Sequence, residues 1–164
     1  MTLMPWALFV LRDLHSEFAV PRANGEKATA HTPCRGYPPG ATKIKPGEDL
    51  QGRVEVENAG GRAGDEVVQL YVTNAHASVP VPIRSLVGFS RIHLKPGERQ
   101  QVSFTLTPRQ LSVIDNNGKR VLEPGRFRIE VGGKQPGFKG TADAATTEVV
   151  SRQFEVTGEV TEIE

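Results

Sequence analysis

The chain has one cysteine, one tryptophan and two tyrosines among its 164 residues. Because Cys34 has no second cysteine to pair with, the chain can form neither an intrachain disulfide nor a thiolate metal cluster of its own. The 20 basic and 19 acidic residues leave a net charge of +1, and their mixing along the sequence argues against a nucleic-acid or anionic membrane surface. Glycine (17) and proline (12) are abundant instead, which favours short strands and tight turns over long helices.

A recognisable targeting segment is also missing from the sequence. The apolar run over residues 3–11 has no basic leader, and charged residues follow it from Arg12 onward, so we expect no signal peptide. The run is too short to cross a bilayer. The residues themselves therefore leave the compartment open.

The first 46 residues show little strand periodicity. Apolar residues in the segment 3–18 recur every three to four positions, which favours a short helix, and a disordered arm is the alternative. Residues 21–46 are rich in Pro, Gly, Ala, Thr and Lys without apolar periodicity, which is typical of a linker. We assign residues 1–40 to an N-terminal extension or linker and begin the folded domain at residue 41.

Alternation of apolar and polar residues predicts strands in the middle of the chain. Residues 53–57 and 126–131 alternate, and residues 101–107 do so most clearly. Residues 67–72 are apolar on both sides, so this strand is expected to be central in its sheet. The side chains predicted to point inward are Val54, Val56, Leu70, Val72, Phe89, Val102, Phe104, Leu106, Phe127, Ile129 and Val131.

Turn residues separate these strands. The prolines at 80 and 82 cannot donate to a ladder, so residues 79–82 are predicted as an edge or crossover before Leu86, Phe89, Ile92 and Leu94 return to the core. Asn117-Gly118 predicts a hairpin between residues 111–114 and 120–122. A patternless loop over 134–147 precedes a late strand on the same surface near residues 150–156, and the last six residues are expected to fray.

These features together define a fold class. About seven short strands, with turn signals every 8–12 residues or so, predict an all-β, antiparallel two-sheet immunoglobulin-like sandwich over residues 41–133. Residues 134–164 then form a loop, the late strand and a tail.

Five stretches, in order, resemble the fibronectin type III-like C-terminal domain of family 3 glycoside hydrolases, the β-glucosidases and β-xylosidases. They are VEVENAG (54–60), GDEVVQLYV (64–72), LVGFSRIHLKPGE (86–98), VSFTL (102–106) and EPGRFRIEVG (123–132). The resemblance implies an accessory module whose partners are the catalytic domains of such an enzyme. Parent enzymes of this type are often secreted or periplasmic.

The same resemblance implies that the chain holds no family catalytic residue. In these enzymes the nucleophilic aspartate and the acid/base glutamate lie in preceding domains without a counterpart here, so we predict no catalytic, cofactor-binding or metal-binding residues and no cofactor. Members usually enter the domain through a Gly-Tyr-Gly-Leu-Ser-Tyr-like stretch, which residues 1–40 lack. We hypothesise that these residues are a non-native extension; intact relatives with the same leader would contradict this.

Few residues in the sequence are candidates for catalysis or metal binding. Glu55 and Glu57 lie about 7 Å apart by strand rise, a separation compatible with a glycosidase pair, but they occupy the polar side of an alternating strand, where solvation is expected. Asp65 and Glu66 open a strand and point to opposite faces, which favours a turn or edge role. The histidines, His15, His31, His76 and His93, show no metal-ligand spacing, and Cys34 has only His31 nearby in sequence.

The remaining candidates for binding sites are the aromatic residues and two loops. Sugar-binding modules present exposed Trp or Tyr platforms, whereas Trp6 and Tyr37 precede the sandwich and only Tyr71 lies within it. Residues 74–83 and 135–147 are loops that could carry a partner site. The accessory module is therefore the leading prediction; a polysaccharide-binding module and a small stand-alone hydrolase are the alternatives, and self-association through a former domain interface is a further expectation.

Overall fold

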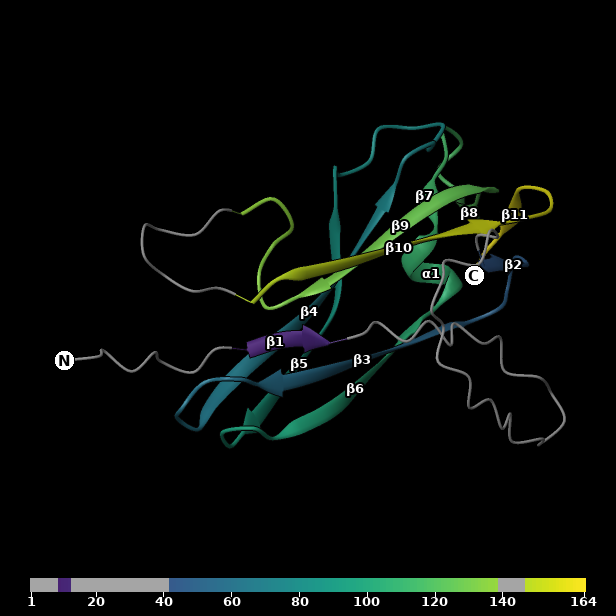
Figure 1. The fold of residues 1–164 in the computed structure, drawn as a ribbon. Helices are drawn as coiled ribbons and strands as arrows, with labels where there is room; N and C mark the ends of the chain where they lie inside the picture. Colours follow the sequence, from purple (N-terminus) through teal and green to yellow (C-terminus); the bar gives the residue numbers. More distant parts are fainter. Residues whose placement is uncertain (1–8, 13–41, 139–146) are drawn as a thin grey trace, which may run out of the picture.

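The computed structural model describes residues 9–12, 42–138 and 147–164 (Figure 1). Strands dominate these residues, and β3, β4, β5, β6, β9 and β10 each have eight residues or more. In chain order the elements are β1 (Phe9–Arg12), β2 (Thr42–Ile44), β3 (Leu50–Asn58), β4 (Gly64–Asn74), β5 (Ser85–Leu94), β6 (Arg99–Leu106), α1 (Pro108–Leu111), β7 (Val113–Ile114), β8 (Arg120–Leu122), β9 (Gly125–Gly132), β10 (Val149–Val156) and β11 (Thr161–Glu162).

Two sheets face each other across one hydrophobic core (Figure 1). The smaller has the strand order β1-β3-β6 and the larger the order β2-β10-β9-β4-β5, while a third, short sheet has the order β11-β8-β7. Val54 and Val56 of the smaller sheet belong to the same buried cluster as Leu70 and Ile129 of the larger. Each inward face leaves water only against the other, so the predicted all-β sandwich is confirmed.

One strand pair departs from the antiparallel prediction. β2 pairs parallel with β10, with Thr42 opposite Phe154 and Ile44 opposite Val156. The linker prediction is therefore wrong for residues 42–44. The reason is packing: Ile44 is 1% exposed, so this short segment contributes an apolar side chain to the core that local composition does not reveal.

The N-terminal prediction also needs correction. Residues 9–12 are neither helical nor a disordered arm: they form β1, which pairs antiparallel with residues 55–58 of β3. Phe9 is largely buried and joins the core. The remaining predictions for the helix, the linker and their residues fall on 1–8 and 13–41, outside the described residues.

β4 is central, as predicted, because it pairs with β5 on one side and β9 on the other. The register with β5 shifts between Leu70 and Tyr71: Leu70 lies opposite Gly88, but Tyr71 lies opposite Leu86. Val87 is thus the extra residue of a β-bulge, which exchanges inward and outward positions along β5.

Leu86 and Phe89 therefore do not return to the core, and this prediction is wrong. Ile92 and Leu94 are buried, and strict alternation from them along β5 turns Phe89 outward, where it is 70% exposed. Leu86 is turned outward by the bulge and is 52% exposed. Phe104 is only partly buried and packs against the core. Its ring lies next to Gly88, 3.3 Å from the position that a Cβ on Gly88 would occupy. The other nine predicted inward residues are buried.

The C-terminal part is integral to the larger sheet. The predicted late strand is β10, which pairs with β9 along its whole length, and its Phe154 and Val156 are each 1% exposed. The expected fraying of the last six residues is wrong at Thr161 and Glu162, which form β11 and pair with β8.

The predicted hairpin is confirmed as β7 and β8. The backbone N–H of Gly118 donates to the carbonyl of Asp115, and Gly118 has a positive φ of 79°. Leu111, expected at the start of the first strand, instead ends α1. Pro108 at the start of this helix and a capping box between Thr107 and Gln110 favour the single turn.

Candidate functional site

Glu55 and Glu57 share one cation on the outer face of the smaller sheet. Arg99 Nη1 lies 3.5 Å from Glu55 Oε1, and Arg99 Nη2 lies 3.1 Å from Glu57 Oε2. The Glu57 side chain is 13% exposed, so the expectation of full solvation is wrong for this residue, which lies opposite Val10 of β1. One arginine between two strand carboxylates is the arrangement of a cross-strand ion pair rather than of an open substrate site.

Asp65 and Glu66 point to opposite faces, as predicted. Asp65 accepts hydrogen bonds from Arg91 and from His93, whose Nδ1 is 2.6 Å from Asp65 Oδ1. These bonds, the one from Arg91 more than the one from His93, hold the pKa of the Asp65 carboxyl below its usual range. Glu66 Oε2 accepts a hydrogen bond from Thr147 Oγ1, 81 positions later in the chain. Both carboxylates therefore serve contacts between segments.

The other predicted candidates do not gather in the structure. His76 follows β4 and lies beside Gly125: its Cβ is 3.8 Å from the position that a Cβ on Gly125 would occupy. His93 is hydrogen-bonded to Asp65. His15, His31, Cys34, Trp6 and Tyr37 lie outside the described residues. Within residues 9–12, 42–138 and 147–164, no three His, Cys, Asp or Glu side chains are grouped as they would be to hold a metal ion.

The described part of the chain contains a small cavity between the sheets and a larger one beside α1. The first, of about 10 Å³, is lined mainly by apolar side chains that include Leu70, Phe104 and Val131. The second, of about 90 Å³, lies beside α1 where Val81 and Pro82 of the predicted loop meet Gln110 and Ser112. Neither contains the predicted carboxylates.

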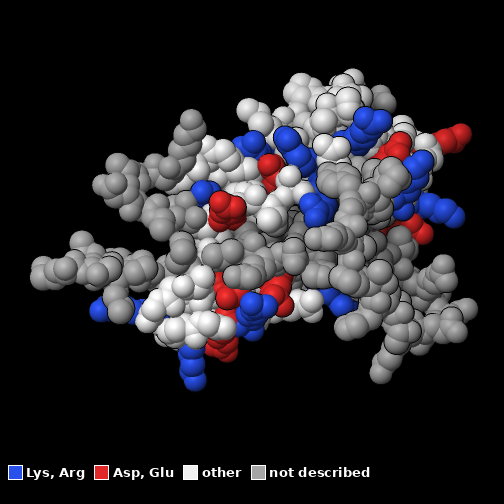
Figure 2. Space-filling view, viewed as in Figure 1, with Lys and Arg blue, Asp and Glu red and all other residues white. Residues whose placement is uncertain are grey.

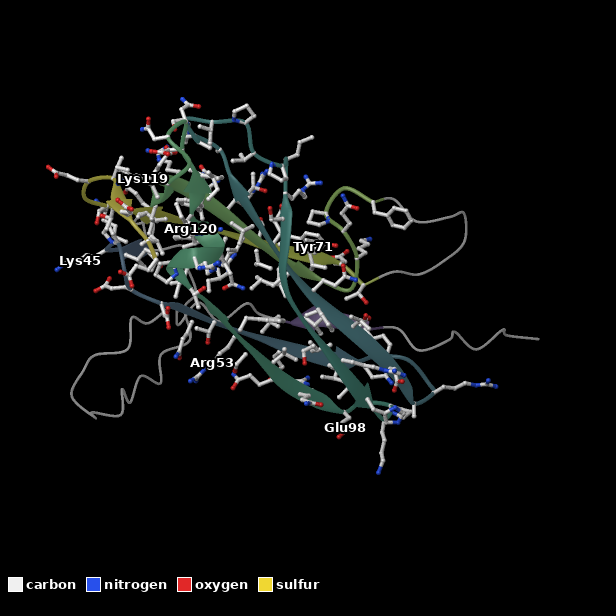
Figure 3. The ribbon with its side chains drawn as sticks, turned by 180° about the vertical axis from the view of Figure 1, so that it is seen from behind. Lys45, Arg53, Tyr71, Glu98, Lys119 and Arg120 are labelled. Atoms are coloured by element: carbon white, nitrogen blue, oxygen red, sulfur yellow. The ribbon has the colours of Figure 1, made fainter. Side chains whose placement is uncertain are left out.

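A polar cluster that sequence reasoning missed lies on the outer face of the larger sheet. Glu130 is 8% exposed, and its Oε2 is 3.5 Å from Arg84 Nε and 3.9 Å from Arg128 Nε. Tyr71 lies opposite Glu130 in the ladder and donates from its hydroxyl to Gln69 Oε1 at 2.6 Å. Figure 3 shows Tyr71 on this part of the sheet.

Only the alternation of Arg128 and Glu130 along β9 signalled this cluster in the sequence. Arg84 comes from the segment before β5 and reaches on to donate to the carbonyl of Pro136 at 2.6 Å. Because 46 positions separate Arg84 from Glu130, no local pattern could join them. The cluster ties three segments together.

Charged side chains of the two signs are interspersed on the face drawn in Figure 2. They form no single basic or acidic field there. None of the helices among the described residues is long and apolar enough to cross a membrane.

Sheet order and packing define the class of protein: an immunoglobulin-like β-sandwich module. Residues 66–135 match the family model described as "Fibronectin type III-like domain". Over 79 residues the chain is 51% identical to a "Beta-xylosidase" of Formosa agariphila, covering 48% of this chain and 11% of that protein. It is 42% identical over 79 residues to a "Periplasmic beta-glucosidase" of Salmonella typhimurium, covering 48% of this chain and 10% of the relative.

Solved structures similar to this chain also belong to β-glucosidases. The crystal structure of a β-glucosidase from Listeria innocua in complex with glucose superposes with a TM-score of 0.63 at 29% identity, over 73% of this chain and 15% of that one. Over about half of its length the chain therefore resembles the fibronectin type III-like domain carried by family 3 glycoside hydrolases, as the sequence motifs predicted. It spans about a tenth of the length of the curated relatives it matches.

Proposed function

We propose that the chain is a non-catalytic structural module that supports the catalytic domains of a β-glucosidase- or β-xylosidase-like enzyme. The observation that carries this proposal is the extent of the match: 79 residues that are 51% identical make up only 11% of the β-xylosidase. A segment of this size leaves most of the relative's length for the catalytic machinery, which supports an accessory role for the segment itself.

The local chemistry favours the same role. The described carboxylates considered as candidates form contacts within the module: Glu55 and Glu57 with Arg99, Asp65 with Arg91, and Glu66 with Thr147. A glycosidase instead needs two carboxyl groups facing a bound sugar, one of them with a raised pKa. Contacts of this kind give the module a defined shape, which suits a rigid support.

A polysaccharide-binding module is the second candidate function. The observation in its favour is that Phe89 and Phe138 are exposed, at 70% and 55%. Sugar rings stack on aromatic faces, and exposed phenylalanines are groups on which such rings can stack. This candidate predicts retention on polysaccharide, which the supporting module does not.

The test is a replacement in the Formosa agariphila β-xylosidase. The enzyme is made intact, without the segment that matches this chain, and with the full chain in place of that segment. We expect the deletion to shorten the half-life of aryl-β-xyloside hydrolysis on warming and the replacement to restore it in part. The purified chain is assayed in parallel on aryl β-xylosides and β-glucosides and on insoluble xylan and cellulose. Turnover by the chain alone would overturn the proposal.

A further inference from the structure

Exposed apolar side chains gather on one side of the larger sheet. Val67, Leu86 and Phe89 are 37%, 52% and 70% exposed, and all three point outward from β4 and β5. The ladder places Phe89 opposite Gln69, and Leu86 opposite the half-buried Tyr71, so these side chains are neighbours on one surface. We name Val67, Tyr71, Leu86 and Phe89 the outer β4–β5 face.

A loop borders this face. Arg84, just before β5, donates to the carbonyl of Pro136 at 2.6 Å, and Phe138, two residues later in the same turn, is 55% exposed. Ile83, next to Arg84, is 83% exposed. Contiguous exposed apolar surface with a polar border is the usual mark of a protein interaction site.

The charges at the border specify the partner. Arg84, Arg91 and Arg128 surround the face, with side chains 25%, 72% and 45% exposed, against the two carboxylates Asp65 and Glu130. Each carboxylate is already contacted by an arginine, Asp65 by Arg91 and Glu130 by Arg84. Because the border has three arginines for two carboxylates, it carries an excess of positive charge. A complementary partner surface is apolar at its centre and bears carboxylates at its edge.

We propose that the outer β4–β5 face docks on the catalytic part of the glycoside hydrolase, at an apolar surface edged by Asp and Glu side chains. This rests on the proposed function. The segments that this chain matches make up only 9–15% of such relatives and solved chains, so the rest of the enzyme is a large surface that lies beside each of them.

Two other occupants fit the face less well. A sugar platform needs free hydrogen-bonding groups beside the rings, but Tyr71 and Gln69 bond to each other, and the aliphatic Leu86 and Val67 lie at the two ends of the face with Phe89 between them. A second copy would oppose like-charged arginine borders around the symmetry axis, which is unfavourable. A protein surface of opposite charge meets neither difficulty.

The experiment uses the enzyme in which the full chain replaces the matching segment of the Formosa β-xylosidase. Phe89→Asp and Leu86→Asp alter the face, and Ile114→Asp and Val160→Asp are matched controls at exposed apolar positions elsewhere. We expect the face variants to shorten the half-life of xylosidase activity on warming at least ~10-fold and the controls to change it less than about twofold. Urea midpoints of the isolated chain should be the same for all four variants.

Each other outcome has a defined meaning. If the unaltered chain does not lengthen the half-life of the deleted enzyme, the proposed function fails. If it does, but the face variants behave like the controls, the docking proposal alone is overturned. If the isolated chain is retained on xylan or cellulose and Phe89→Asp abolishes the retention, the face binds a sugar and the docking proposal is overturned. If the isolated chain sediments as a dimer and Phe89→Asp abolishes the dimer, the face binds a second copy and the docking proposal is likewise overturned.

Discussion

Phe154→Ala should strongly destabilise the chain, although in the sequence Phe154 lies after the loop without a strand pattern at residues 134–147. The side chain is 1% exposed, and its ring stacks on Phe127 with centroids 5.3 Å apart and an interplanar angle of 15°. Removing a buried phenylalanine costs about 3–5 kcal/mol. Since a domain of this size has roughly 5–15 kcal/mol of stability, the loss is a large share of the total.

The stacking can be separated from the burial. Phe154→Leu keeps most of the volume and should cost less than about 1.5 kcal/mol plus the lost ring contact. A double-mutant cycle with Phe127→Leu should give a coupling of about 0.5–1.5 kcal/mol, the usual worth of an aromatic pair beyond its buried area. Phe89→Ala is the matched control, because that ring is 70% exposed, and should cost less than about 0.5 kcal/mol.

Urea unfolding of the full chain, followed by far-UV circular dichroism, measures the single variants and the double variant alike. The midpoints should move while the slope stays constant, since the surface exposed on unfolding hardly changes. A loss below ~1 kcal/mol for Phe154→Ala, or an equal loss for Phe89→Ala, would refute the placement of β10 in the core.

Three more predictions follow from close contacts and charge. A Cβ on Gly132 would lie 2.9 Å from the carbonyl oxygen of Glu148, so Gly132→Ala should cost about 1–3 kcal/mol in urea unfolding, whereas Gly61→Ala, which meets nothing within 4 Å, should be nearly neutral. Asn58 is fully buried and its side chain makes three hydrogen bonds to backbone groups, so Asn58→Ala should cost about 2–4 kcal/mol; a loss under 1 kcal/mol would contradict this. The pKa of the Asp65 carboxyl is lower in the folded chain than in the unfolded chain. The ionised carboxylate therefore stabilises the fold at pH values above the unfolded-state pKa, and this stabilisation is lost as the pH falls through the folded-state pKa. Melting temperatures of Asp65→Asn should therefore fall less steeply than wild type below about pH 4.

Much of the fold could be predicted because strand alternation is a local property. Side chains of a strand point alternately to its two faces, so residues 53–57, 101–106 and 126–131 indicate their own buried sides without knowledge of their partners. Turn residues act over equally short distances, as in the Asp115–Lys119 turn of the hairpin. The order of motifs along these strands was enough to indicate the family.

The candidate docking face could not be predicted, because it depends on register and on distant contacts. The bulge at Val87 exists only relative to the pairing of Leu70 and Tyr71, and it decides that Leu86 points to solvent. The Arg84–Glu130 contact and the Thr147–Glu66 hydrogen bond join residues 46 and 81 positions apart. The sequence by itself determined the long alternating strands and the family that the chain resembles. Only the tertiary structure decided that the short segments 9–12, 42–44 and 161–162 are strands and which apolar side chains remain outside the core, since pairing and burial depend on the partners that the folded chain brings together.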